Sequence, residues 1–528
     1  MNENVNTYNA NNYNEPLSQE PKEKRTFSAT ESIFAWFSLL CGYLFCRVSP
    51  VSQSPFGGLC FVILLFVVTI VIFAIKKCKS KALPLYVAAS AIVISLSLFL
   101  TDNSFLHFFS YTYALASYCY FIYAVCGNEL ETGFSNFILM DYFKAIVITP
   151  FFAIGYLFRG LFSGKLKKSG TAIGKLALGI GLAFIPTLLV FCLLSYDSAF
   201  EDLMRRIFDW NFEDVFSHLG SFILGIPLGM YMFGLFVSSQ DQRSKNVITK
   251  EHCSIAAVKI QIVPTITAFT AVLPVLFLYV VFFISQWDYY ISGFTGKLPK
   301  DFSYAEYARE GFFQLCTVAV INFIIILCVI LFMRRKENKK SVLLKILCLI
   351  ISVFTLILIS TALSKMFLYI EYYGLTHKRI YSTWFMVVLA IVFLLITLNQ
   401  FITKIKMVVV CACIFVVSFG ALALSNVDAR IAEYNVNQYK NSSLPTVDVW
   451  ELYELGYAGV PSIIDLAEYL DGKDTPSTEE SKMKDQIKNH LDWEYEVMLD
   501  EEKGIFDRTL PYMKARRAME KYLKNKEI

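Results

Sequence analysis

Two acidic side chains near the middle of the chain have a spacing that could support chemistry. Asp197 and Glu201 are four residues apart and would share one face of a helix, where Glu201 also faces Arg205. Two carboxylates on one face could hold a cation or a polar substrate. Because the other face carries Phe200 and Leu203, we expect an amphipathic helix that lies on a membrane surface, with the cation or substrate site as the alternative.

A second charged cluster stands at the start of an apolar run. Glu306, Arg309 and Glu310 fall within one helical turn beside Tyr307, and the run that follows contains Asn322. A charge at the lipid boundary is costly unless it is paired or reaches the headgroups. We therefore expect Arg309 to pair with a carboxylate or a lipid phosphate, and a functional pocket is the alternative.

A third polar segment covers residues 365–379. Gly374 can end a helix there as the residue after its last turn. Glu371 and Arg379 are candidate partners for the charged side chains of the second cluster. The aromatic residues around them fit the belt that Tyr and Trp form at a membrane interface.

Signatures of known enzyme and metal chemistry are absent from the sequence. The chain has 5 His and no His-Glu-x-x-His pair, and it lacks the phosphate-binding and dinucleotide-binding glycine motifs and the Gly-x-Ser-x-Gly motif. We therefore expect no catalytic residue, no metal, no cofactor and no nucleic-acid partner. The 13 Cys all precede the last hundred residues, and we expect them to act as small apolar residues.

The elements that must position these residues are membrane helices. Hydrophobic residues make up 56% of the chain and charged residues 17%, with a mean hydropathy of +0.51. A span needs about 20 mostly apolar residues, and its backbone must satisfy its own hydrogen bonds. We predict an all-α polytopic bundle of about 11 spans, at 31–46, 56–75, 83–100, 104–126, 172–195, 217–237, 260–285, 312–333, 341–363, 381–402 and 407–424.

One further apolar stretch, 134–158, differs from the spans. It contains Asp141, Lys144 and Pro150, and basic residues follow it at once. A span there would place the strongest basic loops on opposite sides of the membrane. We expect an interfacial or re-entrant helix.

Lys and Arg residues predict the orientation of the bundle. With the N-terminus in the cytoplasm, the inner segments carry 23 of these residues and the outer loops carry 9. An odd number of spans then leaves the C-terminus outside the cell membrane. The Asn-rich residues 1–30 are predicted to be a disordered cytoplasmic tail without a cleaved signal peptide.

After the predicted membrane domain, 31–424, the composition changes. Residues 425–528 hold 21 acidic and 14 basic side chains. Asp448 can cap a short helix that ends at Gly456, and Pro461 can begin the next. We predict a small helical module at 445–471 in the extracytoplasmic tail, followed by a more solvated helical hairpin.

Several of these stretches together resemble a known family. Tyr304–Leu315, Tyr373–Tyr381 and Asn426–Asn435 occur in this order in a multi-pass chain. This arrangement resembles the bacterial membrane proteins of domain-of-unknown-function family 4153, with the related family 4173. The resemblance covers roughly 170–470, implies a bacterial inner-membrane protein and brings no catalytic residues. The positions that match the family are Asp197, Tyr307, Arg309, Gly374, Thr376, Arg379, Asn426 and Asp428.

The leading functional hypothesis is a non-enzymatic membrane protein whose outer loops and tail sense or bind an envelope protein or a small ligand. Such a protein should expose an apolar or aromatic patch on its tail. The first alternative is a transporter, which should place Asn322 and a charged residue in a cavity near the midplane. The second is a membrane enzyme for lipid or cell-wall precursors, which should place Asp197 or Glu306 in an outer cleft beside another titrating group.

Overall fold

The computed structural model describes residues 25–48, 54–78, 82–162, 190, 212–285, 312–334, 342–402, 406–500 and 503–526. Within these ranges the chain is helical without β-strands, and one isolated β-bridge pairs Val263 with Met333. The prediction of an all-α polytopic bundle is therefore confirmed. By their internal contacts the residues divide into two units, 1–37 with 157–209 and 38–156 with 210–528.

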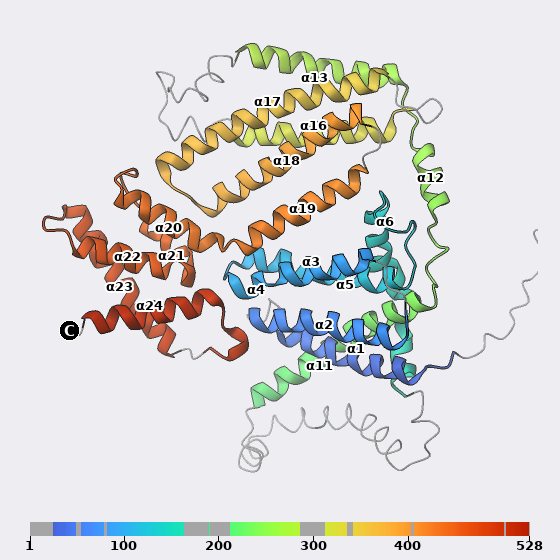
Figure 1. Ribbon diagram of the computed structural model, residues 1–528, viewed down its shortest axis with the longest axis horizontal. Helices are drawn as coiled ribbons and strands as arrows, with labels where there is room; N and C mark the ends of the chain where they lie inside the picture. Colours follow the sequence, from blue (N-terminus) through green and yellow to red (C-terminus); the bar gives the residue numbers. More distant parts are fainter. Residues whose placement is uncertain are drawn as a thin grey trace, which may run out of the picture. The chain divides into compact units, whose positions relative to one another are not determined.

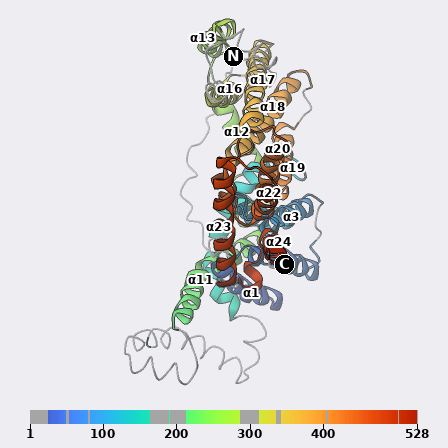
Figure 2. The ribbon, with the colours of Figure 1, turned by 90° about the vertical axis from the view of Figure 1, so that its left-hand side faces the viewer.

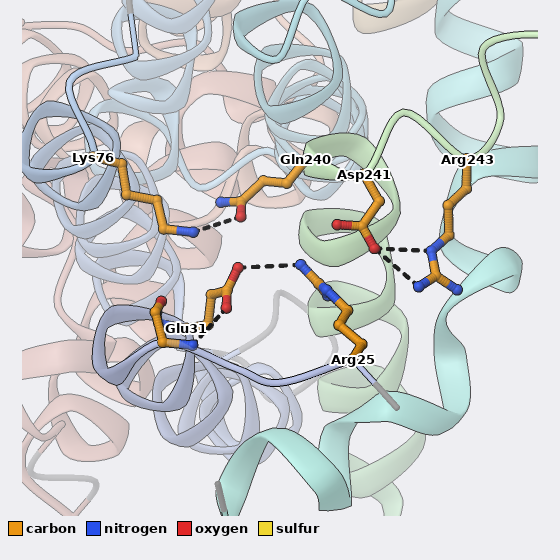
Figure 3. A network of polar contacts seen from close by, with 7 residues as sticks. Arg25, Glu31, Lys76, Gln240, Asp241 and Arg243 are labelled. Atoms are coloured by element: carbon orange, nitrogen blue, oxygen red, sulfur yellow. Dashed lines mark hydrogen bonds and ion pairs between the residues drawn. The ribbon is translucent and has the colours of Figure 1, made fainter. Parts of the chain in front are cut away.

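The first unit contains the start of α1 (Ala29–Val48) and the short helix α7 (Leu157–Leu161). Ser28 and Glu31 form a capping box at the start of α1. The Ser28 amide donates to Glu31 Oε2 at 2.8 Å, and the Glu31 amide donates to Ser28 Oγ at 3.3 Å. Arg25 Nη2 donates to Glu31 Oε1 at 3.1 Å (Figure 3). These bonds fix the residue at which the first membrane helix begins.

The second unit continues α1 and adds a group of helices that pack around α5 (Figure 1). They are α2 (Pro55–Ile75), α3 (Ala82–Ser95), α4 (Ser97–Leu100), α5 (Ser104–Val125), α6 (Ile138–Phe143) and α11 (Phe212–Gln240). Aromatic rings fill the space between α2 and α5, where Phe66 meets Tyr118 and Phe121 edge-on at 5.4 and 5.8 Å.

The stretch 134–158 forms an irregular helix. After α6 the chain makes a π-helical turn at Lys144–Ile148 and a 3₁₀ turn at Thr149–Phe152, and the helix breaks at Ala153. Pro150 lacks an amide hydrogen, which removes one bond of a regular helix. A broken helix suits a re-entrant loop as well as a broken span, so the interfacial or re-entrant placement stays a prediction.

A second group of helices follows α12 (Lys250–Lys259). It consists of α13 (Thr265–Ser285), α16 (Phe312–Phe332), α17 (Val342–Tyr373) and α18 (His377–Phe401). These helices share one apolar core that includes Ala319, Ile351, Met386 and Phe393. α17 packs against both α16 and α18, and it continues to Tyr373 instead of ending at the predicted residue 363.

The last span, α19 (Met407–Leu424), leads into a helical tail. The tail contains α20 (Val427–Lys440), α21 (Val449–Glu454), α22 (Val460–Asp471), α23 (Thr478–Asp500) and α24 (Leu510–Lys526), and Figure 2 shows α22, α23 and α24 from the side. The predicted helices after Asp448 and at Pro461 are confirmed. One core joins α20 and α22 to α23 and α24, and it also includes Ile94, Leu106 and Phe419 from the ends of α3, α5 and α19.

The predicted spans can be compared with the helices one by one. Nine described helices are long and apolar enough to cross a membrane, and each corresponds to a predicted span. The predicted span 104–126 corresponds to α5, a 22-residue helix with several Ser and Tyr residues that is not among these nine. The predicted span 172–195 lies outside the described residues.

Gly225 and Gly229, four residues apart in α11, mark a close approach of two helices. α11 crosses α1 there, and a Cβ atom on Gly225 would lie 2.5 Å from the carbonyl carbon of Gly42. A Cβ atom on Gly229 would lie 2.9 Å from the Ser38 oxygen. Small residues at such a crossing let the two backbones touch.

We expect Gly225→Leu to destabilise the protein. The leucine side chain must force α11 away from α1, and overpacking of this kind costs about 1–3 kcal/mol. Thermal unfolding in detergent would show a lowered midpoint. Gly220→Leu is the matched control, since a Cβ atom on Gly220 has no atom within 4 Å. Equal midpoints for the two variants would contradict the close crossing.

Candidate functional site

The predicted site residues divide into two sets. Asn322, Glu371, Gly374, Thr376, Arg379, Asn426 and Asp428 belong to described helices and turns. Five others lie outside the described residues, namely Asp197, Glu201, Glu306, Tyr307 and Arg309. The pairing of Arg309 therefore stays a prediction, and so does the surface helix with its two carboxylates.

The turn between α17 and α18 is built around Gly374. Its φ of +75° lies in the left-handed region that glycine favours, and its amide donates to Ile370 O at 2.8 Å to close the end of α17. A Cβ atom on Gly374 would also collide with Asn435 Oδ1 of α20. Both the backbone angle and the space next to α20 thus require glycine.

Asn435 joins this turn to the tail. Its Oδ1 accepts from the Leu375 amide at 2.6 Å, and its Nδ2 donates to the Leu375 carbonyl at 2.8 Å. The side-chain amide thereby satisfies both backbone groups of one turn residue. Asn435 is buried, and hydrogen bonds at such a position are costly to leave unmade.

Thr376 and Arg379 close the same turn. Thr376 is the N-cap of α18, where its hydroxyl accepts from the Arg379 amide at 3.5 Å. Arg379 Nη1 donates to the carbonyls of Tyr373 at 2.7 Å and Gly374 at 2.5 Å, and its guanidinium lies 4.1 Å from the centre of the Tyr369 ring. The structure thus gives these two residues local capping bonds. Glu371 lies exposed in the last turn of α17.

Asp428 is the centre of the site. This carboxylate is 3% exposed and lies in the first turn of α20. It accepts a hydrogen bond from Asn103 Nδ2 at 2.9 Å and one from His377 Nε2 at 2.6 Å. Asn426 precedes it with φ +47°, a conformation that asparagine tolerates better than most residues. Two donors from distant segments therefore hold one buried charge.

Asp102 extends the contact to the end of the chain. It accepts a hydrogen bond from Thr509 Oγ1, and Thr509 in turn caps α24 by accepting from the Tyr512 amide at 3.3 Å. Burial raises the pKa of Asp102 to about 6, and the Asp428 carboxylate adds to this shift. The Thr509 bond and the Lys503 ammonium oppose it.

We name this site the polar junction, defined by Asp102, Asn103, Gly374, His377, Asp428 and Asn435. It connects the loop before α5, the α17–α18 turn and α20. Because Asn103 and His377 donate to Asp428 and Thr509 donates to Asp102, its geometry suits a structural attachment of the tail. In the described part of the chain, no group of three or more His, Cys, Asp or Glu side chains is placed so that it could hold a metal ion.

A second polar cluster was not predicted from the sequence. Lys144 is fully buried, and its ammonium donates to Ile248 O at 2.8 Å and lies 5.8 Å from the centre of the Tyr123 ring. Asp141 Oδ1 accepts from the Leu130 amide at 3.0 Å. The Lys144 bond holds the connection between α11 and α12 against the π-helical turn, and the Asp141 bond holds the loop between α5 and α6.

Polar contacts also mark the end of α11. Lys76 donates to Gln240 Oε1 at 2.5 Å, and Arg243 contacts Asp241 at 2.9 Å (Figure 3). Arg243 also donates to Tyr156 Oη at 3.1 Å. The basic residues at this end are therefore used to fix the connection.

Asn322 lies away from the polar junction, fully buried in α16. Its Oδ1 accepts from Tyr279 Oη of α13 at 2.5 Å, and its Nδ2 donates to Thr355 Oγ1 of α17 at 2.8 Å. The amide thus ties three helices together. Hydrogen bonds of this kind are typical of packed membrane helices.

The tail carries a row of rings in which the two tryptophans are exposed and the other two rings are half-buried. We name it the tail aromatic surface: Trp450, Tyr453, His490 and Trp493. Trp450 is 70% exposed and Trp493 is 57% exposed. The centres of the stacked Tyr453 and His490 rings are 3.6 Å apart. The Trp450 ring meets the Tyr453 ring edge-on, with 5.6 Å between their centres. α21 and α23 thus present adjacent rings on one surface.

We expect Asn435→Ala to lower the free energy of unfolding by about 1–3 kcal/mol, because it leaves the amide and carbonyl of Leu375 unpaired. Asn437→Ala on the exposed face of α20 is the matched control, with an expected change within about 0.5 kcal/mol. Thermal unfolding and proteolysis of the tail measure both effects. Equal losses in the two variants would show that Asn435 does not hold the turn.

Asp102 should give the stability a pH dependence. The pKa of Asp102 in the folded protein is about 6, above the ordinary value of 3.8. Between these two pH values the folded state binds more protons than the unfolded state. The free energy of unfolding therefore falls as the pH rises from about 4 to about 6. Asp102→Asn mimics the protonated form. It should raise the unfolding midpoint at pH 8 and leave it nearly unchanged at pH 4, whereas Asp474→Asn, at an exposed position, should have no effect at either pH. A midpoint difference independent of pH would contradict the raised pKa.

Comparison with known proteins places the chain in a family. The model of the family described as Domain of unknown function (DUF4153) matches residues 88–466, well over half of the chain. The similarity to family 4173 stays a prediction. None of the curated proteins and none of the solved structures is similar to the chain. The chain therefore belongs to the DUF4153 family, and its long apolar helices make it a membrane protein.

Proposed function

We propose that this is a non-enzymatic protein of the cell membrane that binds an envelope partner through its helical tail. In this proposal the N-terminus is cytoplasmic and α20–α24 lie outside the cell. The observation that carries the proposal is the tail aromatic surface, with Trp450 70% and Trp493 57% exposed. Exposed tryptophans placed together are typical of a binding surface, because a partner that covers them removes a large apolar area from water.

The charge of the tail supports a partner with complementary groups. Residues 425–528 carry seven more acidic than basic side chains, 21 against 14. Asp448, Glu454 and Asp492 are exposed in α21 and α23 or next to them. A basic partner would be attracted by this charge and could place cationic groups against the indole rings.

The polar junction supports a relay from the tail to the bundle. Asp428 and Asn435 connect α20 with the α5 loop and the α17–α18 turn. Ser54 next to α2 also donates to Asp507 before α24 at 2.5 Å. A partner that shifts the tail would therefore act directly on the ends of several membrane helices.

The transport hypothesis receives less support from the structure. It requires Asn322 to line a path, and both polar groups of this amide are already used by Tyr279 and Thr355. The enzyme hypothesis depends on Asp197 and Glu306, which lie outside the described residues. The exposed rings of the tail therefore favour binding as the proposed function.

Photo-crosslinking in living cells tests this proposal. A photoreactive phenylalanine analogue at position 450 or 493 should form an adduct with the same partner, and that partner should reside in the envelope outside the cytoplasm. The matched control is position 521, where Lys521 is exposed on α24. Adducts at 450 and 493 no stronger than at 521 would refute the binding surface, and a cytoplasmic partner would refute the orientation.

A further inference from the structure

A cavity lies inside the second unit between α1, α2, α5 and α11. Its volume is about 370 Å³, within the usual size range for a ligand pocket, which begins at roughly 300 Å³. Its wall is formed mainly by apolar side chains, among them Phe45, Phe61, Leu115 and Leu228. Thr112 also lines it and is exposed, so the cavity reaches the outside of the helix bundle.

The two tyrosine hydroxyls on the wall are already hydrogen-bonded within the protein. The hydroxyls of Tyr118 and Thr69 share a hydrogen bond at 2.8 Å. Tyr231 Oη donates to Ile146 O at 2.7 Å and lies 3.7 Å from Cys119 Sγ. An occupant of the cavity therefore meets an apolar wall, which suits neither water nor a polar solute.

The depth of the cavity indicates its occupant. The wall residues come from the middle of their helices, including 61–65 of α2, 112–119 of α5 and 228–235 of α11. In a spanning bundle these positions lie within the hydrocarbon layer, where lipid chains are the surrounding solvent.

We infer that this cavity binds one acyl chain of a membrane glycerophospholipid. The chain enters beside Thr112 and packs between α5 and α11. An occupied cavity gives its wall atoms the dispersion contacts that an empty one would lose. The bound lipid thus strengthens the packing around Tyr231, whose hydroxyl supports the π-helical turn through Ile146.

A labelled lipid tests this inference. The full chain is reconstituted into phosphatidylethanolamine and phosphatidylglycerol vesicles that include phosphatidylglycerol with a diazirine at the middle of one acyl chain. After illumination, adducts are mapped by peptide mass spectrometry. We expect the peptides that contain 112–119 and 228–235 to carry at least fivefold more label than the lipid-facing peptide around Val93.

Two variants decide the outcome. Ala116→Phe fills the cavity and should reduce its label at least fivefold, and Val93→Phe on the exposed side of α3 should leave the label unchanged. If Ala116→Phe does not fold, Thr112→Phe at the entrance replaces it. Even labelling of all spans, or labelling of the cavity that survives both cavity variants, would overturn the inference. Wild-type cavity peptides without label would do the same.

Discussion

The arrangement of the tail depends on one buried charge, the carboxylate of Asp428. A charge that is 3% exposed is stable only when hydrogen-bond donors replace its water. Asn103 and His377 supply those donors from the start of α5 and the start of α18. Asn435, about two turns further along α20, fixes the neighbouring turn at Leu375. The tail is therefore attached by hydrogen bonds to buried polar groups as much as by the burial of apolar side chains.

Features that depend on local physics could be predicted from the sequence. Lipid requires long apolar runs, so nine described helices appear where the hydropathy placed them. Gly374 and Asp448 act as expected at a helix end and a helix start, because their capping bonds reach only a few residues along the chain.

Contacts between distant segments could not be predicted in this way. Asn103 and Asp428 are 325 residues apart, and Lys144 finds its acceptor 104 residues later, at Ile248. No spacing rule relates such pairs, since the packing of the helices brings them together. The charges of Asp141 and Lys144 indicated an unusual helix, and their partners became visible only in three dimensions. α17 likewise continues beyond the predicted residue 363 to Tyr373, where Arg379 donates to the Tyr373 carbonyl.

The shared core of the tail has a consequence for the order of assembly. Ile94 comes from α3, Leu106 from α5 and Phe419 from α19, and all three complete a core that otherwise belongs to α20–α24. During synthesis α20–α24 follow the membrane helices. They can bury their apolar side chains against this surface only when α3, α5 and α19 are already packed together. A correctly closed tail therefore requires that the membrane domain has assembled, and a misinserted bundle would leave the tail open to proteolysis.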